Sequence, residues 1–357
     1  MKIVVACGGT GGHAFPGLAV AEVLRSRGHE VTVWDSGRDV ESSVMRSWNG
    51  NVFSTGARQL RPKNFFAILR SIFACRREMR RYRPDVLLAM GSYSSLPPVM
   101  AAGGCSVPVV LHEANTVPGR AVEFLAKFAS AVAISFDGTE KYLKNKNVVR
   151  TGLPVRPGIA SGRRFDFIPK DAFVVFVTGG SQGAHAVNIL ASDALVALAR
   201  SLKERESARP LYVIHQTGAK DESAVMSAYA RNAIPARVVA FENEMANAFA
   251  SADIVIARAG ASTCFELASC GKPALLIPLP SAMRNHQHYN AEAFAATGAA
   301  DEGIQDDLTP HQLARYLEAK YDRPDSLGRM SAKMLSLATP DAAVRVAELV
   351  ENCARKE

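Results

Sequence analysis

Two glycine-rich segments of this chain have the composition of phosphate-binding turns. Gly8–His13 follows the apolar run 2–7, and Thr178–Ala184 follows the apolar run 173–177. A helical pattern begins after each of them. Glycines let backbone N–H groups approach an anion closely, and the start of a helix adds partial positive charge. Two such turns at this separation predict two nucleotide-type α/β domains.

A third segment, Ala257–Glu266, also follows an apolar run and opens a helical pattern. Its first amides could hold a second phosphate of the same ligand, and Glu266 could accept both hydroxyls of a ribose. Thr263 and Glu266 also have the spacing of a capping box, in which their side chains only satisfy the start of a helix. The residues alone favour the capping box.

His13 ends the first glycine turn, beside a predicted helix start. The positive end of a helix favours a neutral imidazole, and a neutral imidazole accepts a proton near pH 7. A histidine that only forms a hydrogen bond with the loop explains the position equally well. His13 is therefore a candidate base, with that alternative open.

No metal or other cofactor is expected. His112 and Glu113 begin like the helix of a zinc protease, but the second histidine of that motif is missing. His286 and His288 alternate without a third ligand nearby. The chain contains no Asp-x-Asp, so metal-bridged binding of a nucleotide sugar by paired aspartates has no support.

The main alternative from another class is an NAD(P)-dependent oxidoreductase with a Rossmann domain. Gly9, Gly11 and Ala14 fit the dinucleotide-binding fingerprint, and Asp35 lies where a ribose-binding acid belongs. The second glycine turn argues against this class, because a substrate domain does not require a complete second nucleotide-type site.

The elements that must position these residues follow a regular order. Apolar runs alternate with helical patterns along all 357 residues, as in doubly wound parallel sheets of the α/β class. The predicted strands are 2–7, 31–34, 85–89, 107–111 and 131–134 in the first half, and 173–177, 211–215, 237–240, 253–256 and 274–277 in the second. A stretch rich in Pro and Gly at 151–158 predicts a linker. We therefore expect domains at 1–155 and 156–337, with a last helix near 340–354.

The formal net charge of +8 is concentrated in the segment 58–83, which holds nine basic residues and one acidic residue. Phe65, Phe66 and Phe73 recur there at helical spacing. A basic, aromatic, amphipathic helix suits an anionic lipid surface. An ordinary helix that packs its apolar stripe on the sheet explains the pattern equally well. Nucleic acid is not expected as a partner, because no recognised binding module accompanies the charge.

Composition points to a globular protein of a reducing compartment. Apolar residues make up 48% of the chain and charged residues 21%. The six cysteines form no Cys-x-x-Cys pair, and several lie in apolar runs, which suits the cytoplasm. No segment reaches the ~20 continuous apolar residues that a membrane-spanning helix needs.

The segment Gly8–Ala19 closely resembles the opening of the MurG family, the N-acetylglucosaminyltransferases of peptidoglycan synthesis. Further matching blocks keep the family's order over nearly the whole chain: 91–95, 112–115, 153–156, 179–184, 215–218, 258–266 and 285–291. The resemblance implies a GT-B glycosyltransferase, with two Rossmann-like domains that face a cleft. It implies an acceptor- and membrane-facing N-terminal domain, a C-terminal domain that binds UDP-GlcNAc, and a last helix, about 338–357, that packs back on the N-terminal domain.

The implied reaction is an inverting transfer of GlcNAc from UDP-GlcNAc to the MurNAc 4-hydroxyl of undecaprenyl-pyrophosphoryl-MurNAc-pentapeptide, which converts lipid I to lipid II. The partner is thus a lipid-linked muramoyl-peptide acceptor in the inner leaflet. The resemblance therefore favours 58–83 as a peripheral contact with the anionic cytoplasmic face of the cell membrane. Another GT-B nucleotide-sugar transferase with a lipid acceptor is the alternative within the same fold.

The resemblance also implies roles for individual residues. The residues implied for UDP-GlcNAc are Thr10, Gly11, Gly12, Asn115, Arg156, Ser181, Glu242, Ala261, Ser262, Thr263, Glu266 and Gln287. Those implied for the acceptor diphosphate are Gly11, Gly12, His13, Ser92, Tyr93 and Ser94. Ser181 and Arg156 would serve the donor phosphates, Glu266 the ribose, and Gln287 the sugar hydroxyls.

His13 is the leading candidate base, and Asn115 would lie near the reacting sugars. The chain departs from the family pattern at four positions. The family usually has glycine where this chain has Ser92 and a polar residue where it has Ala114. It commonly has asparagine where this chain has Leu153, and often an aliphatic residue where it has Glu242. At Glu242 the implied contact is therefore between the uracil and the backbone.

Overall fold

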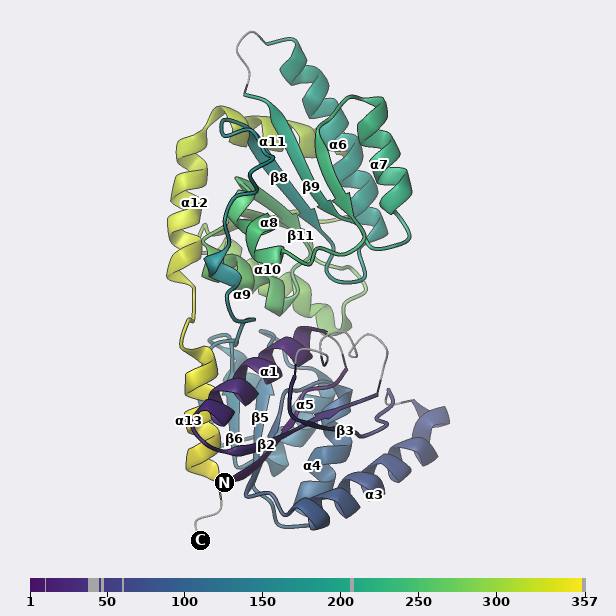
Figure 1. Cartoon of the computed structure of the whole chain (residues 1–357), viewed down its shortest axis with the longest axis vertical. Helices are drawn as coiled ribbons and strands as arrows, with labels where there is room; N and C mark the ends of the chain where they lie inside the picture. Colours follow the sequence, from purple (N-terminus) through teal and green to yellow (C-terminus); the bar gives the residue numbers. More distant parts are fainter. Residues whose placement is uncertain (10, 38–44, 46–47, 60, 206–208, 355–357) are drawn as a thin grey trace. The chain divides into compact units, whose positions relative to one another are not determined.

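The computed structural model describes residues 1–9, 11–37, 45, 48–59, 61–205 and 209–354. The chain forms two compact units (Figure 1). The first unit contains residues 1–157 and the end of the chain from Thr339 onward, and the second contains residues 158–338. Each unit is built on one parallel sheet. The predicted doubly wound α/β class is confirmed.

The sheet of the first unit has the strand order β3-β2-β1-β4-β5-β6-β7, and every neighbouring pair is parallel. Its strands are β1 Lys2–Ala6, β2 Glu30–Asp35, β3 Asn51–Ser54, β4 Val86–Ala89, β5 Val109–Glu113, β6 Ala131–Ile134 and β7 Val148–Arg150. In β1, Ile3 and Val5 belong to the core on one face, whereas Val4 and Ala6 belong to the core on the other. A strand buried on both faces requires a continuous apolar run, which is why the sequence reveals this strand so clearly.

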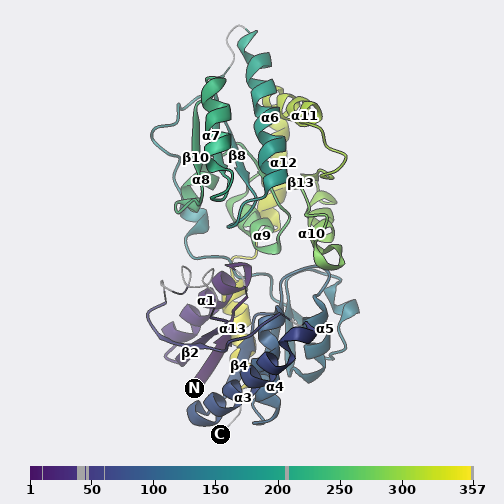
Figure 2. The ribbon, with the colours of Figure 1, turned by 90° about the vertical axis from the view of Figure 1, so that its right-hand side faces the viewer.

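Helices cover both faces of the first sheet. They are α1 Gly11–Ser26, α3 Phe65–Tyr82, α4 Leu96–Gly103, α5 Arg120–Leu125 and α13 Ala342–Cys353. α1 and α13 contribute to the core that contains Ile3 and Val5. α3, α4 and α5 contribute to the opposite core, and Figure 2 shows α3 and α4 side by side.

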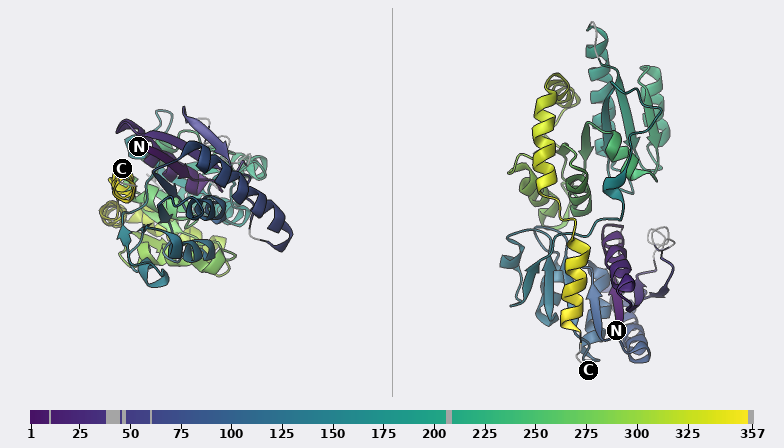
Figure 3. Two further views of the ribbon diagram at one scale, coloured as in Figure 1. Left: turned by 90° about the horizontal axis from the view of Figure 1, so that it is seen from below. Right: turned by 60° about the vertical axis from the view of Figure 1, so that its left-hand side comes forward.

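The last helix, α13, completes the first unit from the far end of the sequence. Its Val346 and Val350 are fully buried in the same core as Leu24 of α1. Glu351 of α13 accepts hydrogen bonds from Arg27 (2.6 Å) and His29 (2.8 Å) just beyond α1. Figure 3 shows α13 lying along the strands of this unit.

The sheet of the second unit has the order β10-β9-β8-β11-β12-β13, again with all neighbours parallel. Its strands are β8 Phe173–Thr178, β9 Leu211–Gln216, β10 Ala236–Val239, β11 Ile254–Ala257, β12 Ala274–Leu276 and β13 Ala300–Glu302. Its helices are α6 His185–Lys203, α7 Glu222–Arg231, α8 Met245–Ser251, α9 Ala261–Cys270, α10 His286–Ala295, α11 Pro310–Asp322 and α12 Pro324–Ser336. Phe173 and Val175 of β8 share a core with α6, α7 and α11, whereas Phe176 contacts the ring of Phe249 in α8.

Both sheets reverse their strand order next to the first strand of the unit. β1 lies between β2 and β4, and β8 lies between β9 and β11. In open parallel sheets, ligands bind outside the carboxyl ends of the strands at such a reversal. The two places to look for ligand-binding residues are therefore the β1/β4 and β8/β11 strand ends.

Candidate functional site

The glycine turn after β1 packs against the turn after β4. Gly9 has φ +116°, and a Cβ built on it would lie 2.7 Å from Oγ of Ser92. The Ser94 hydroxyl donates a hydrogen bond to the carbonyl of Gly8 (2.5 Å). The residues implied for the acceptor diphosphate therefore share the β1/β4 strand ends: Gly11, Gly12, His13, Ser92, Tyr93 and Ser94. Thr10 lies outside the described residues.

His13, the third residue of α1, is oriented by the end of β4. Its Nδ1 lies 2.9 Å from the carbonyl oxygen of Met90. A carbonyl can only accept a hydrogen bond, so Nδ1 carries the hydrogen and the neutral ring has its lone pair on Nε2. A Cβ built on Gly91 would lie 3.9 Å from Cε1 of His13, so the ring rests beside the turn after β4.

Asn115 follows β5 and is held by the buried Glu113. Oε1 of Glu113 accepts hydrogen bonds from the backbone N–H (2.8 Å) and from Nδ2 (3.0 Å) of Asn115, and Oε2 accepts one from the N–H of Gly119 (3.2 Å). Burial raises the pKa of Glu113 to about 7, although the hydrogen bonds from Asn115 and Gly119 oppose the rise. Burial also lowers the pKa of His112 to about 4, so that imidazole is neutral at pH 7. The position of Asn115 thus depends on a carboxyl group that titrates near neutrality.

Arg156 lies near the end of the first unit and contacts α1. Its guanidinium carbon is 4.5 Å from the ring centroid of Phe15, two residues beyond His13. Such a contact contributes about 0.5–1 kcal/mol at exposed sites. Phe15 therefore helps to fix Arg156 beside the helix that follows the first glycine turn.

The glycine turn after β8 fits closely against the turn after β9. Gly183 has φ +71°, and a Cβ built on it would lie 1.9 Å from the carbonyl oxygen of Thr217. Gln216 donates from Nε2 to the carbonyl of Gly180 (2.7 Å) and accepts at Oε1 from the N–H of Glu242 (3.1 Å). Gln216 thereby joins the turns after β8, β9 and β10.

α9 begins directly after β11, across the strand-order reversal from Ser181, which is exposed in the turn after β8. Gly260 is its N-cap residue and, as a glycine, has no side chain that could cap the helix. Thr263 therefore lies in the first turn rather than at the cap, and the capping-box interpretation of Thr263 and Glu266 is wrong. Ala261, Ser262 and Thr263 form the first turn, and Glu266 is buried in the next.

Arg258 places a buried positive charge just before α9. Its guanidinium donates to the carbonyls of Ile277 (3.2 Å) and Pro278 (3.0 Å) and to Oε1 of Gln305 (2.7 Å). All three acceptors are neutral, and burial lowers the pKa of Arg258. These contacts hold the guanidinium in place but do not neutralise its charge.

Gln287 lies in the first turn of α10, where its Oε1 accepts a hydrogen bond from the N–H of Leu279 (3.0 Å). The neighbouring histidines have different partners. Nδ1 of His288 lies 2.7 Å from Glu302, whereas Nδ1 of His286 bonds a backbone carbonyl. Within the described ranges, no group of three or more His, Cys, Asp or Glu residues could hold a metal ion.

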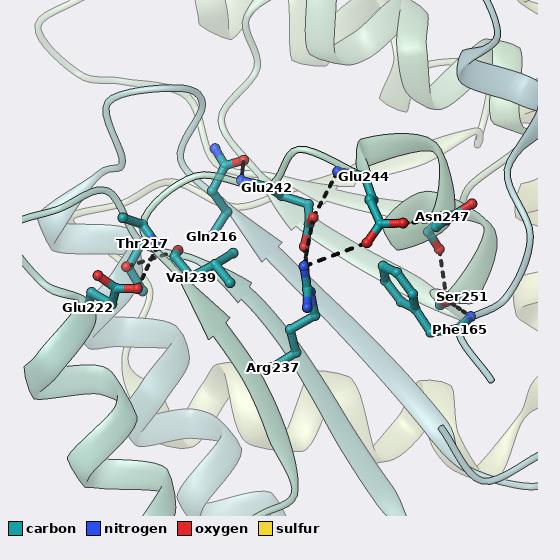
Figure 4. A network of polar contacts seen from close by, with 11 residues as sticks. Phe165, Gln216, Thr217, Glu222, Arg237, Val239, Glu242, Glu244, Asn247 and Ser251 are labelled. Carbon is teal, nitrogen blue, oxygen red and sulfur yellow. Dashed lines mark hydrogen bonds and ion pairs between the residues drawn. The ribbon is translucent and has the colours of Figure 1, made fainter. Parts of the chain in front are cut away.

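The Glu242 side chain is already fully engaged, as Figure 4 shows. Its carboxylate is buried and receives Nε (2.8 Å) and Nη2 (3.1 Å) of Arg237 and the N–H of Glu244 (2.9 Å). The carboxylate therefore fixes the loop after β10. The N–H of Glu242 is also engaged, by Oε1 of Gln216 (3.1 Å), so a ligand contact with the backbone of this residue would use its carbonyl.

The basic helix α3 presents its aromatic residues outward. Phe65 is 57% exposed, Phe66 83% and Phe73 66%. The side of the helix that packs on the domain carries Cys75 and Met79 instead, together with Ser71. The three phenylalanines therefore lie away from the packed side of α3, whose core contacts come from Cys75 and Met79. Among the described residues, no helix is long and apolar enough to cross a membrane.

Comparison with known proteins decides the family. Residues 3–134 match the N-terminal domain of glycosyltransferase family 28, and residues 174–346 match its C-terminal domain. The chain belongs to glycosyltransferase family 28. The resemblance to MurG is confirmed, and the chain is a glycosyltransferase with the GT-B fold. The oxidoreductase alternative is thereby set aside.

Individual relatives of this glycosyltransferase are similar over their full length. It is 35% identical over 371 residues to the UDP-N-acetylglucosamine--N-acetylmuramyl-(pentapeptide) pyrophosphoryl-undecaprenol N-acetylglucosamine transferase of Geobacter metallireducens, with 100% of both chains covered. It is 36% identical to the protein of the same name from Brucella canis, covering 98% of this chain and 93% of that one. The crystal structure of Acinetobacter baumannii MurG superposes with a TM-score of 0.77 at 29% identity, covering 98% and 99% of the two chains.

The sequence patterns alone indicate no site role for Glu113, Phe15 or Gln216. Glu113 has one sign in the sequence, because it follows His112 directly after the apolar run 107–111. Phe15 and Gln216 have none, because their partners, Arg156 and Glu242, are distant in the sequence and only folding brings them together.

Proposed function

We propose that this protein transfers GlcNAc, with inversion, from UDP-GlcNAc to the MurNAc 4-hydroxyl of undecaprenyl-pyrophosphoryl-MurNAc-pentapeptide. The observation that carries the proposal is the 35% identity, over whole chains, to a relative whose name states this reaction. Two independent glycine turns at strand-order reversals support it, because donor and acceptor each contain a diphosphate.

The donor is assigned to the second unit. Ser181 and the first turn of α9 would face its diphosphate, and Glu266 would accept the ribose hydroxyls. The position of Glu266 in the second turn of α9, where its side chain is buried rather than turned to solvent, supports this role. Gln287 would meet the sugar hydroxyls with its amide nitrogen, and the backbone at Glu242 would meet the uracil.

The difficult part of the reaction is the negative charge that develops on the departing UDP. The α9 start and the buried, un-neutralised charge of Arg258 both favour that anion. The resemblance to the family also assigns Arg156 to the donor phosphates. These groups would stabilise the leaving group by hydrogen bonds and fixed charge.

The acceptor is assigned to the first unit. Its diphosphate would lie against the turns after β1 and β4, and its sugar hydroxyl would attack C1 of GlcNAc as the bond from C1 to the phosphate oxygen breaks. His13 would take the hydroxyl proton on Nε2, because Nδ1 is committed to the carbonyl of Met90. Asn115 would orient the reacting sugars.

The acceptor's lipid requires a membrane contact, for which α3 and the flanking basic residues of 58–83 are the proposed surface. Exposed phenylalanines next to arginines suit an anionic inner leaflet, which they would reach peripherally from the cytoplasm. No nucleic acid partner is proposed.

The test of the reaction compares ligands and then products. UDP-GlcNAc should bind saturably, NAD(P) should not, and a short-chain lipid I analogue should gain one GlcNAc with β-configuration while UDP is released. NAD(P) binding without UDP-GlcNAc binding would overturn the proposal. UDP-GlcNAc binding with transfer only to a different lipid acceptor would keep the donor assignment and reject the acceptor.

A further inference from the structure

Ser92 has a backbone conformation that L-residues rarely adopt. It lies just after β4 with φ +69° and ψ 170°. Positive φ combined with extended ψ is a region populated almost only by glycine, and a residue with a Cβ is strained there. By contrast, Arg83, Arg284 and Asn285 also have positive φ but lie in the ordinary left-handed helical region. Strain of this kind persists where the surrounding structure enforces it, most often at ligand sites.

The hydroxyl of Ser92 differs from those of its neighbours. Ser94 donates to the carbonyl of Gly8, and Ser95 donates to the carbonyl of Gly91. In the described part of the chain, the Ser92 hydroxyl makes no such bond. It lies instead over the glycine turn, with Oγ 2.7 Å from the place where a Cβ of Gly9 would be. The strained backbone thus aims an uncommitted donor at the β1/β4 strand ends.

We propose that the Ser92 hydroxyl donates a hydrogen bond to the diphosphate of the acceptor and that the strained backbone holds it there. The proposal rests on the proposed function and adds a side-chain donor to backbone contacts. Glycine would fit the conformation better but could not supply the hydroxyl. Ser92 is therefore a residue at which conformational stability and acceptor affinity are opposed.

Two substitutions separate the hydroxyl from the strain. Ser92→Ala removes the hydroxyl and keeps the strained Cβ, whereas Ser92→Gly removes both. Steady-state transfer to a short-chain lipid I analogue should show the acceptor KM raised about tenfold in both variants, the usual size for a hydrogen bond to a charged group. The donor KM should stay within about twofold. The Tm should rise by about 2–5 °C in Ser92→Gly only.

Ser106 provides the matched control, because it also has positive φ (+54°) but lies in the turn between α4 and β5. Ser106→Gly should leave the acceptor KM unchanged. If the acceptor KM of Ser92→Ala equals that of the wild type, the inference is overturned. This holds even if Ser92→Gly loses affinity for the acceptor, because the flexibility of the glycine backbone would then be the cause. Absence of transfer by the wild-type protein would instead overturn the proposed function.

Discussion

Glu113 shows how one buried side chain can set the behaviour of a neighbouring one. Its two carboxylate oxygens organise the loop after β5 and fix both amide groups of Asn115. An ionised carboxylate accepts all of these hydrogen bonds, whereas a protonated one gives up an acceptor position. Because burial raises the pKa of Glu113 to about 7, part of the population loses this arrangement slightly below neutral pH.

The same pKa predicts how stability depends on pH. The folded pKa of about 7 lies above the ordinary value of 4.5, so the folded protein binds the Glu113 proton more tightly than the unfolded chain does. The free energy of unfolding of the wild type, relative to Glu113→Gln, should therefore fall as pH rises from about 4.5 to about 7 and then stay constant. The fall should be about 3 kcal/mol. Chemical denaturation at several pH values measures it, with Glu140→Gln as the control for the loss of an exposed carboxylate. A difference that is independent of pH would contradict the raised pKa.

His13 is the residue whose loss should separate chemistry from donor binding. His13→Ala should lower single-turnover transfer by about 10²–10⁴-fold, the usual contribution of a general base, with UDP-GlcNAc affinity retained. His29→Ala is a matched control, because His29 also lies near α1 but binds Glu351. Turnover within about threefold of wild type would exclude His13 as the base.

At the scale of elements, the sequence reveals the strands that are buried on both faces. All ten predicted strands are present, but β3, β7 and β13 were not predicted. Each of these is an edge strand of three or four residues, partly exposed, so none needs a continuous apolar run. Two features near the predicted site could not be read from the sequence for a related reason. Glycine turns are local patterns, whereas the start of α9 and the contact between Phe15 and Arg156 depend on backbone and tertiary geometry.

The turn after β8 offers a test of how closely two turns must approach. Gly180 and Gly183 both have positive φ, but a Cβ on Gly180 would meet no atom within 4 Å, whereas one on Gly183 would overlap the Thr217 carbonyl. Gly180→Ala should cost about 1 kcal/mol of unfolding free energy from the backbone alone. Gly183→Ala should cost about 3 kcal/mol or more and should weaken UDP-GlcNAc binding, because the turn must move. Denaturation and ligand titration measure both effects, and equal losses in the two variants would show that the approach of the turns is unimportant.

At the scale of the whole molecule, charge is distributed very unevenly. The balance of +8 within 58–83 equals the formal net charge of the entire chain. The remaining residues are therefore balanced overall. An anionic surface would attract the molecule chiefly through one segment of the first unit.

Charge reversal tests this attraction. Arg70, Arg77 and Arg80 are exposed on α3, and changing all three to Glu should reduce co-sedimentation with anionic vesicles by about 100-fold or more at low salt, since each contributes about 1 kcal/mol. Changing Phe66 and Phe73 to Ser should reduce binding even at high salt, because apolar insertion is not screened.

The matched control reverses Arg315, Arg323 and Arg329, which are exposed in the second unit. It makes the same change in net charge and should leave vesicle binding nearly intact. Equal losses in the two triple variants would mean that net charge, rather than the α3 surface, governs binding. None of these variants should change UDP-GlcNAc affinity.

The discontinuous first unit has a consequence for biosynthesis. The ribosome delivers residues 1–157 first, but the helix that completes their core, α13, is synthesised last, after the whole of the second unit. During translation the core face around Leu24 lacks Val346 and Val350, whereas the second unit is contiguous and can fold as soon as it emerges. A chain that stops near residue 338 would therefore carry a complete second unit and a first unit whose core still lacks α13, so the first unit matures only after the second has been translated.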